Sequence, residues 1–417
     1  MQIVLFEDAL VTKLYPITVG RAAYNITCGS FRLLDWVETL AKDLKASIRG
    51  VVRPHLAEIQ RVDFPQLQGG AAAGPTLFIN ARLAPSPDVL TKLRAIATAK
   101  KPVLIRDDQA VLVAYVGQDE PETPAQTDVA HLADHIEQKL APRLPAGDVK
   151  FTAMNYPHDV VRANMDAIRS SLEWRLKQGG YQEQQPGLFV APEAQVGPFL
   201  ALDTSAGPIL IDRGATIGPH CFLRGPIYIG PKCRVIEHSA IKDAVSLGHT
   251  TKIGGEVEAS VVEAFTNKQH HGFLGHSYLG SWINLGAGTC NSDLKNTYGA
   301  VRMDYRGESV ATGMQFVGCM IGDYSKSAIN TGIFTGKTVG VCSMMYGFVT
   351  TNVPSFVNYA RLFGQVTELP PEVTVTTQQR MFARRNVTPR PCDQQLIHAM
   401  YELTRHERQL AGEPLSL

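Results

Sequence analysis

Residues 211–259 read IDRGATIGPHCFLRGPIYIGPKCRVIEHSAIKDAVSLGHTTKIGGEVEA, and this stretch decides the fold. Every sixth residue in it is apolar: Ile211, Ile217, Leu223, Ile229, Val235, Ile241, Leu247, Ile253 and Ala259. Several of these are followed directly by glycine, as at Gly218 and Gly230. A six-residue period with small residues at the turns is the hexapeptide repeat, in which three hexads form one triangular coil. The stretch therefore predicts a left-handed parallel β-helix.

The repeat slips out of register after Ala259 and resumes at Phe273. We expect an inserted loop there that contains residues 265–272, with the sequence FTNKQHHG. A second excursion is expected at about residues 291–315. Loops that leave a solenoid are where such a scaffold carries its function, because the coils themselves are rigid and repetitive.

The first 150 or so residues differ, because short apolar runs alternate with helical stretches. The predicted strands are 3–6, 47–52, 76–79, 103–106 and 110–115, and the predicted helices are 33–43 and 88–99. This alternation indicates an α/β domain. We expect an α/β domain over residues 1–157, a connector helix and linker over 158–185, the β-helix over 186–365, and a tail with one short terminal helix, starting near Asp393, over 366–417.

Composition excludes several classes of function. The chain has 417 residues with 40 basic against 39 acidic side chains, so neither nucleic acid nor an anionic membrane is an expected partner. No apolar run approaches the roughly 20 residues of a membrane span, and acidic residues come too early for a signal peptide, so a cytoplasmic protein is expected. Its seven cysteines include no C-x-x-C pair, which argues against a disulfide framework or a cysteine zinc site.

The first expected loop and the following GAG turn carry residues suited to acyl transfer. Attack of an amine on a thioester needs a base for the amine proton and donors for the developing oxyanion. His270 can be the base, and Asn284 with the backbone near 286–288 can be the donors. Since a β-helix has no deep crevice of its own, such a site would form between neighbouring chains of a trimer. A zinc site is an alternative, because His249, His270, His271 and His276 are close in sequence.

Residues 267–296 carry a resemblance to a known family. The segments GFLGHSYLG (272–280) and NLGAGT (284–289) resemble the bifunctional GlmU family of glucosamine-1-phosphate N-acetyltransferases and UDP-N-acetylglucosamine pyrophosphorylases. The N-terminal Glu7-Asp8, LYPIT (14–18) and Arg21 resemble a divergent bacterial branch of it. The resemblance implies a sugar-nucleotidyltransferase-like (Rossmann-like) first domain, acetyl-CoA as acyl donor, a homotrimer, and a nucleotide sugar used in cell-envelope biosynthesis.

Matching residues carry the family's roles over to this chain. His270 matches the catalytic base, Asn284 an active-site asparagine, and Ala287, with Gly288 beside it, the acetyl-CoA contact. Lys242 and Lys268 are candidates for the phosphate of the acceptor. Phe273 stands where the family has a substrate-binding tyrosine, and Asp293, with Asn291 close by, stands where it has a sugar-binding asparagine.

The first domain departs further from the family. It lacks the glycine-rich phosphate loop, and Asn80-Ala81-Arg82 stand where the family's magnesium-binding aspartate is expected. Lys13 and Arg21 are candidates for a nucleotide phosphate, together with Asn80 and Arg82, and Asn164 could match a second Mg²⁺ ligand. The sequence thus predicts an acetyl-CoA-dependent N-acetyltransferase of an amino sugar phosphate or nucleotide-linked amino sugar, with possible UDP-sugar pyrophosphorylase activity. The alternatives are a non-catalytic sugar-nucleotide sensor or scaffold, and a zinc-dependent hydrase.

Overall fold

The computed structural model describes residues 1–69, 74–117 and 129–410. By their contacts they form two units, which are described separately. The first comprises Met1–Leu14, Arg21–Ile26 and Phe31–Asn155, and the second comprises Tyr15–Gly20, Thr27–Ser30 and the chain from Tyr156 onward. Within the described ranges, no helix is long and apolar enough to cross a membrane.

The first unit is built on a five-stranded sheet. Its order is β4 (Ser47–Val51), β1 (Gln2–Phe6), β5 (Thr76–Asn80), β7 (Val111–Val116) and β6 (Val103–Arg106). β1 is parallel to both of its neighbours, and β7 is antiparallel to β5 and β6. β1, β5 and β7 are buried along their whole length, as expected of apolar strands covered on both faces. The predicted α/β domain and its strands are confirmed.

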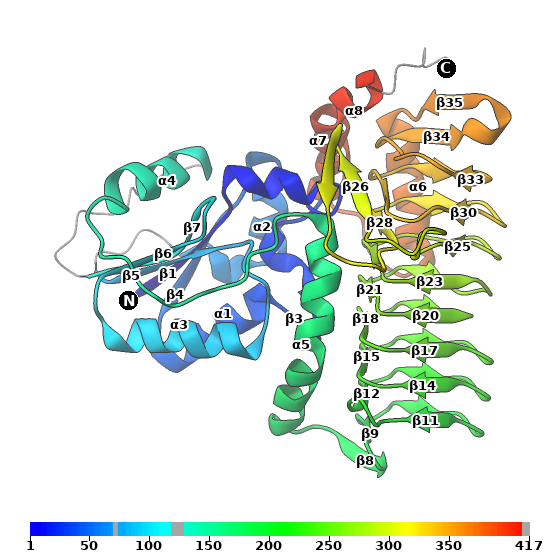
Figure 1. Cartoon of the computed structure of the whole chain (residues 1–417), viewed down its shortest axis with the longest axis horizontal. Coiled ribbons are helices and arrows are strands. Elements are labelled where there is room, and N and C mark those ends of the chain that lie inside the picture. Colours follow the sequence, from blue (N-terminus) through cyan, green and yellow to red (C-terminus); the bar gives the residue numbers. More distant parts are fainter. Residues whose placement is uncertain (70–73, 118–128, 411–417) are drawn as a thin grey trace. The chain divides into compact units, whose positions relative to one another are not determined.

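Helices cover both faces of this sheet (Figure 1). α1 (Leu33–Leu44) packs beside α3 (Pro87–Ala99), and α2 (Ala57–Asp63) follows β4. On the other face, α4 (Val129–His135) leads into a turn whose Ile136 and Leu140 pack with Val4 and Phe78 of the sheet. α3 begins where its sequence predicts, because the Ser86 hydroxyl accepts the Val89 amide and Pro87 occupies the first turn.

The second unit contains the predicted β-helix, whose strands stack on three faces (Figure 1). The first face runs β8 (Gln182–Gln185), β9 (Leu188–Val190), β12 (Ile209–Ile211), β15 (Ile227–Ile229), β18 (Val245–Leu247), β21 (Val261–Val262), β24 (Tyr278–Leu279), β28 (Cys319–Ile321) and β31 (Lys337–Val339). The second runs β10 (Gln195–Val196), β13 (Thr216–Ile217), β16 (Arg234–Val235), β19 (Lys252–Ile253) and β22 (Asn267–Lys268), then β29 (Lys326–Ser327), β32 (Met344–Met345), β34 (Val357–Ala360) and β35 (Gln365–Glu368). The third runs β11 (Ala201–Asp203), β14 (Phe222–Arg224), β17 (Ala240–Lys242), β20 (Glu256–Glu258) and β23 (Phe273–Gly275), then β25 (Cys290–Asn291), β30 (Gly332–Ile333) and β33 (Phe348–Val349). The coils are parallel, and the end strands β8 and β35 pair antiparallel with β9 and β34.

The prediction of an inserted loop between Ala259 and Phe273 is wrong. The coil from Arg234 to its partner Lys252 advances eighteen residues, whereas the next, from Lys252 to Asn267, advances only fifteen. The chain is shortened there, chiefly at the two-residue corner Gly254-Gly255, where Gly255 has φ +74°. The slip in the repeat is therefore caused by a tight corner, which glycine allows because it has no Cβ. Residues 265–272 remain part of the β-helix coils.

The second expected excursion is present as an antiparallel hairpin, β26 (Arg302–Tyr305) and β27 (Glu308–Ala311). Its turn residues Arg306 and Gly307 both have positive φ, as a type I′ turn requires. The chain then rejoins the first face at β28.

Helices also cover parts of the β-helix. α5 (Pro157–Lys177) follows its first face (Figure 1), where Ile168 and Leu172 pack on Leu210 and Tyr228. The predicted terminal helix is present as α7 (Pro391–Leu403) and α8 (Arg405–Leu410), and α6 (Pro371–Arg384) precedes it. Asp393 is not the cap itself: it lies in the first turn and accepts the Arg390 amide.

Candidate active site

Two corners from successive coils stack at the edge between the second and third faces. The first, residues 269–272, joins β22 to β23, and the second, residues 286–289, leads into β25. The Gly288 amide donates to the His271 carbonyl at 3.1 Å, which ties the corners together. A Cβ at Gly272 would lie 2.2 Å from the Thr289 carbonyl oxygen, so only glycine permits this approach. Residues that are seventeen positions apart in sequence become neighbours here.

The two corners present two exposed imidazoles and one free amide donor. His270 is exposed, and its imidazole makes no hydrogen bond to any residue the structure describes. His271, next to His270, is also exposed and makes no side-chain hydrogen bond within the described residues, and its Nε2 would lie 3.3 Å from a Cβ at Gly288. In the facing corner, the amides of Gly286, Gly288 and Thr289 all donate within the β-helix. The Ala287 amide has no acceptor among the described residues and is partly exposed. The first corner therefore carries an exposed imidazole, and the corner stacked on it carries an N–H that can meet an oxyanion.

Asn284 lies on the second face, immediately before the corner that contains Ala287 and Gly288. It is exposed, and its side-chain oxygen accepts the Asn267 side-chain amide at 3.5 Å. Asn267 in turn accepts a hydrogen bond from Arg385 at the end of α6. Asn284 is thus oriented by a chain of polar side chains and retains hydrogen-bonding capacity for a ligand.

Lys268 points into the β-helix, in the interior position that Ile253 fills one coil earlier. Its residue is 2% exposed, and its ammonium donates to the carbonyls of Gly254 at 2.7 Å and His270 at 3.1 Å. Burial lowers the pKa of Lys268 to about 8. In this position the ammonium is not available to a phosphate at the surface, and instead fixes the backbone of the corner that presents His270.

The third face carries the other predicted acceptor contacts. Lys242 lies between Glu256 at 2.6 Å and Glu258 at 2.9 Å. Burial opposes its charge, but hydrogen bonds to the two carboxylates prevail and raise the pKa of Lys242. Two acids around one ammonium leave this patch negative, so a phosphate here would meet repulsion as well as attraction.

Phe273, Asn291 and Asp293 lie further along the same face. The Asn291 side chain is buried and bonds both the amide and the carbonyl of Gly275. A Cβ at Gly275 would lie 2.4 Å from the Phe273 ring and 2.3 Å from Asp293, so both side chains close over the glycine. Asp293 accepts from His276 Nδ1 at 2.8 Å, and the His276 ring stacks on Phe316.

The four histidines of the zinc alternative are distributed over three corners of the triangle. His249 follows β18, His270 and His271 precede β23, and His276 follows β23. A repeat of about six residues necessarily sends successive corner residues to different edges. Over the described part of the chain, no group of three His, Cys, Asp or Glu side chains could hold a metal ion. These histidines do not form one ligand set.

In the first unit, the carboxyl ends of the parallel strands hold two buried ion pairs. Glu7 pairs with Arg53 at 3.0 Å and also accepts the amides of Arg53 and Ala23. Asp8 pairs in bidentate geometry with Arg82, through Nε at 2.8 Å and Nη2 at 2.7 Å. This edge, between β1 and β5 where the strand order reverses, is where open α/β sheets bind their ligands.

The predicted nucleotide residues separate into different environments. Asn80 and Arg82 meet at this edge, where the Asn80 amide donates to Asp8 at 2.8 Å. Lys13 reaches Gln109 at 3.4 Å, and Arg21 is buried with its carbonyl bonded to Arg53. Asn164 belongs to the second unit, where its oxygen accepts the Gly29 amide and the Ser246 hydroxyl and its nitrogen donates to Ala244.

These environments do not fit a magnesium ion. Mg²⁺ binds hard oxygen ligands, usually carboxylates supported by phosphates and water. Here each of the two acids at the sheet edge is paired with a buried arginine, and the oxygen of Asn164 is already shared by two donors. No metal-dependent step follows from this donor set.

Some features of the candidate site could not be read from the sequence. Cys290, the exposed cysteine, lies directly beside the first corner, where its sulfur accepts the Phe273 amide at 3.3 Å. The pairing of His276 with Asp293 and the contact of Asn267 with Arg385 also escaped prediction. The partners are 17 and 118 residues apart, and no local motif signals such contacts.

Comparisons with known proteins find relatives of both parts of the chain's predicted family. Residues 3–178 fit a family described as sugar nucleotidyl transferase. A bifunctional sugar-1-phosphate nucleotidylyltransferase/acetyltransferase from Sulfurisphaera tokodaii is 27% identical over 148 residues, which are 35% of this chain and 37% of that protein. Bifunctional protein GlmU from Bordetella parapertussis is 26% identical over 162 residues, covering 33% of this chain and 35% of that one. The matches thus span little more than a third of these relatives, and they confirm the predicted resemblance.

Proposed function

We propose that this chain, a divergent relative of the GlmU-type bifunctional enzymes, is an acetyl-CoA-dependent N-acetyltransferase whose acceptor is an amino sugar phosphate or a nucleotide-linked amino sugar. One observation carries the proposal. An exposed His270 and the Ala287 amide, neither of which has a hydrogen-bond partner among the described residues, lie on two stacked corners of one β-helix edge.

The residues of this edge can divide the reaction between them. His270 removes the proton of the acceptor amine as the nitrogen attacks the thioester carbonyl. The Ala287 N–H, with Asn284 beside it, stabilises the oxyanion that develops there. The nitrogen–carbon bond forms, the carbon–sulfur bond breaks, and coenzyme A leaves as its thiol when the proton is returned. Gly288 allows the close packing of this corner, because a Cβ there would lie 2.1 Å from the Asn330 side-chain oxygen.

A trimer completes the site in this proposal. The exposed corner has no wall of its own, and Ile329, Phe334 and Phe348 expose apolar side chains on the coils that follow it. Phe334 and Phe348 are 49% and 53% exposed and lie together, with ring centroids 6.4 Å apart. An apolar cluster on a regular face is suited to burial against a second copy.

For the first unit we propose sugar-1-phosphate nucleotidyl transfer, supported by the family match over residues 3–178. Pyrophosphate release from UTP and a sugar 1-phosphate, with magnesium present, tests this part separately. Because Asp8 and Glu7 are held by arginines, we expect low turnover. Binding of a nucleotide sugar without turnover would assign the unit to the sensor class.

The first experiment follows the free thiol released from acetyl-CoA, with a panel of amino sugar 1-phosphates and UDP-amino sugars as acceptors. His270→Ala should lower acceptor-dependent release by about 10²- to 10⁴-fold, the usual effect of losing a general base. His238→Ala, at an exposed corner of an earlier coil, is the matched control and should keep the wild-type rate.

A third variant, His271→Ala, decides which of the two neighbouring imidazoles is the base. Wild-type rates in His270→Ala would refute the assignment of the base. No release with any acceptor, combined with tight binding of a UDP-sugar, would replace the transferase by the non-catalytic sensor.

A further inference from the structure

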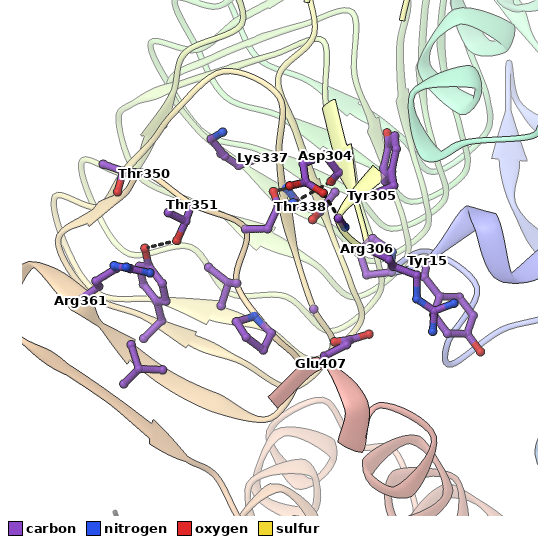
Figure 2. Close-up of a pocket in the computed structure, with 18 of the residues that line it drawn as sticks. Tyr15, Asp304, Tyr305, Arg306, Lys337, Thr338, Thr350, Thr351, Arg361 and Glu407 are labelled. Carbon is purple, nitrogen blue, oxygen red and sulfur yellow. Dashed lines mark hydrogen bonds between the residues drawn. The ribbon is translucent and has the colours of Figure 1, made fainter. Parts of the chain in front are cut away.

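A cavity lies in the second unit, and its lining includes none of the corner residues 269–272 and 286–289. Its volume is about 620 Å³, within the range of small-molecule sites. The hairpin turn, β31, the chain from Thr350 to Pro354 and α8 line it. Figure 2 shows Arg306 beside Tyr15 on one side, with Thr350, Thr351 and Arg361 on the other.

Two cations in this cavity have no carboxylate partner among the residues described. The Arg306 guanidinium donates to His406 Nε2 at 2.6 Å and lies 4.9 Å from the centre of the Tyr15 ring. A guanidinium only donates, so His406 Nε2 accepts, and His406 Nδ1, 3.1 Å from the Leu403 carbonyl, carries the proton. Lys337 makes no side-chain hydrogen bond or ion pair within the same described residues.

The two acids that line the cavity accept hydrogen bonds from backbone amides. Asp304 accepts the Gly307 amide at 2.8 Å in the hairpin turn, and Glu407 accepts the Ser355 amide at 2.9 Å. Neither acid pairs with Arg306 or Lys337. The lining holds three cations, Arg306, Lys337 and Arg361, against these two acids, so a net positive charge of one remains. It lies in a concave, partly apolar space, and such a space attracts anions.

We propose that this cavity binds a nucleoside diphosphate. Arg306 offers the planar donor fork that suits phosphate oxygens, and Lys337 adds a point charge. Pyrophosphate alone would fill only part of a volume of this size, and the apolar walls suit the base and ribose. The site is distinct from the proposed acetyl-transfer edge, since its lining includes no residue of either corner.

Calorimetric titration of the full chain with UDP, ADP and pyrophosphate tests the proposal. Arg306→Gln and Lys337→Met should each weaken nucleoside diphosphate binding roughly ten- to a hundredfold, the effect of losing a charge-assisted hydrogen bond. Arg302→Gln is the matched control: Arg302 lies on the same hairpin, outside the cavity, and bonds Ser309. It should bind like wild type.

The proposal stands apart from the acetyltransferase assignment, because His270→Ala should retain full UDP binding whatever its rate of acetyl transfer. Absence of saturable binding by the wild type, or equal affinities in all variants, would overturn it. Pyrophosphate binding as tightly as UDP would show that only an anion is recognised, and would overturn the nucleotide part. Displacement of UDP by acetyl-CoA, lost in Arg306→Gln, would make the cavity part of the donor site and overturn its independence.

Discussion

Lys268→Met tests the most unusual feature of the β-helix, a lysine in an interior position. Burial lowers the pKa of this lysine from 10.5 to about 8, so the folded protein binds its proton less readily than the unfolded chain does. Stability rises with pH wherever the unfolded state binds more protons. The buried ammonium therefore costs the fold about 3 kcal/mol below pH 8, at 1.36 kcal/mol for each pH unit, and this cost is relieved as the pH rises to about 10.5.

Urea unfolding of wild type and Lys268→Met at pH 7 and pH 10 measures this cost. The free energy of unfolding of the wild type should gain about 2.5 kcal/mol more over this interval than that of the variant. Burial also lowers the pKa of Lys326 to about 8. Because Lys326 is present in both proteins, its contribution to the pH dependence cancels in the difference. Lys295→Met, which removes a lysine bonded to the Ala300 carbonyl, should follow the wild type. Equal pH dependence in wild type and Lys268→Met would refute the reasoning.

Three further predictions follow from the packing. Asp8→Asn should destabilise the first unit by about 3–5 kcal/mol in urea unfolding, because it leaves Arg82 buried without its charge partner; a loss under 1 kcal/mol would contradict this. Gly275→Ala should lower the free energy of unfolding by roughly 1–3 kcal/mol and slow acetyl transfer. Gly299→Ala is the control and should leave stability unchanged, because its Cβ would meet only a side-chain nitrogen at 3.8 Å. Equal melting temperatures of the two variants would refute this prediction. Phe348→Asp should convert a trimer to monomers in light scattering, and a wild type that is already monomeric would exclude the proposed assembly.

The elements of this protein are strongly encoded in its sequence. A period of six with apolar interior positions admits one architecture, and the strands of the first unit are apolar runs separated by clear helix signals. The expected loop before Phe273 failed for a specific reason. A register slip of the repeat has two explanations, an insertion or a shortened coil, and the sequence pattern is the same for both. The two-residue corner Gly254-Gly255 decides between them.

The sequence by itself determined the β-helix, the α/β unit before it and the second excursion from the coils. These features depend on local periodicity and on motifs of a few residues. Only the tertiary structure decided which charges are neutralised. Arg53 and Arg82 form ion pairs with the two acids at the sheet edge, and Lys268 is buried inside the β-helix. Arg306 and Lys337 have no acid partner within the described part of the chain. The partners of a charged side chain come from distant elements, and its energy depends on burial and on these partners together, which no local pattern contains.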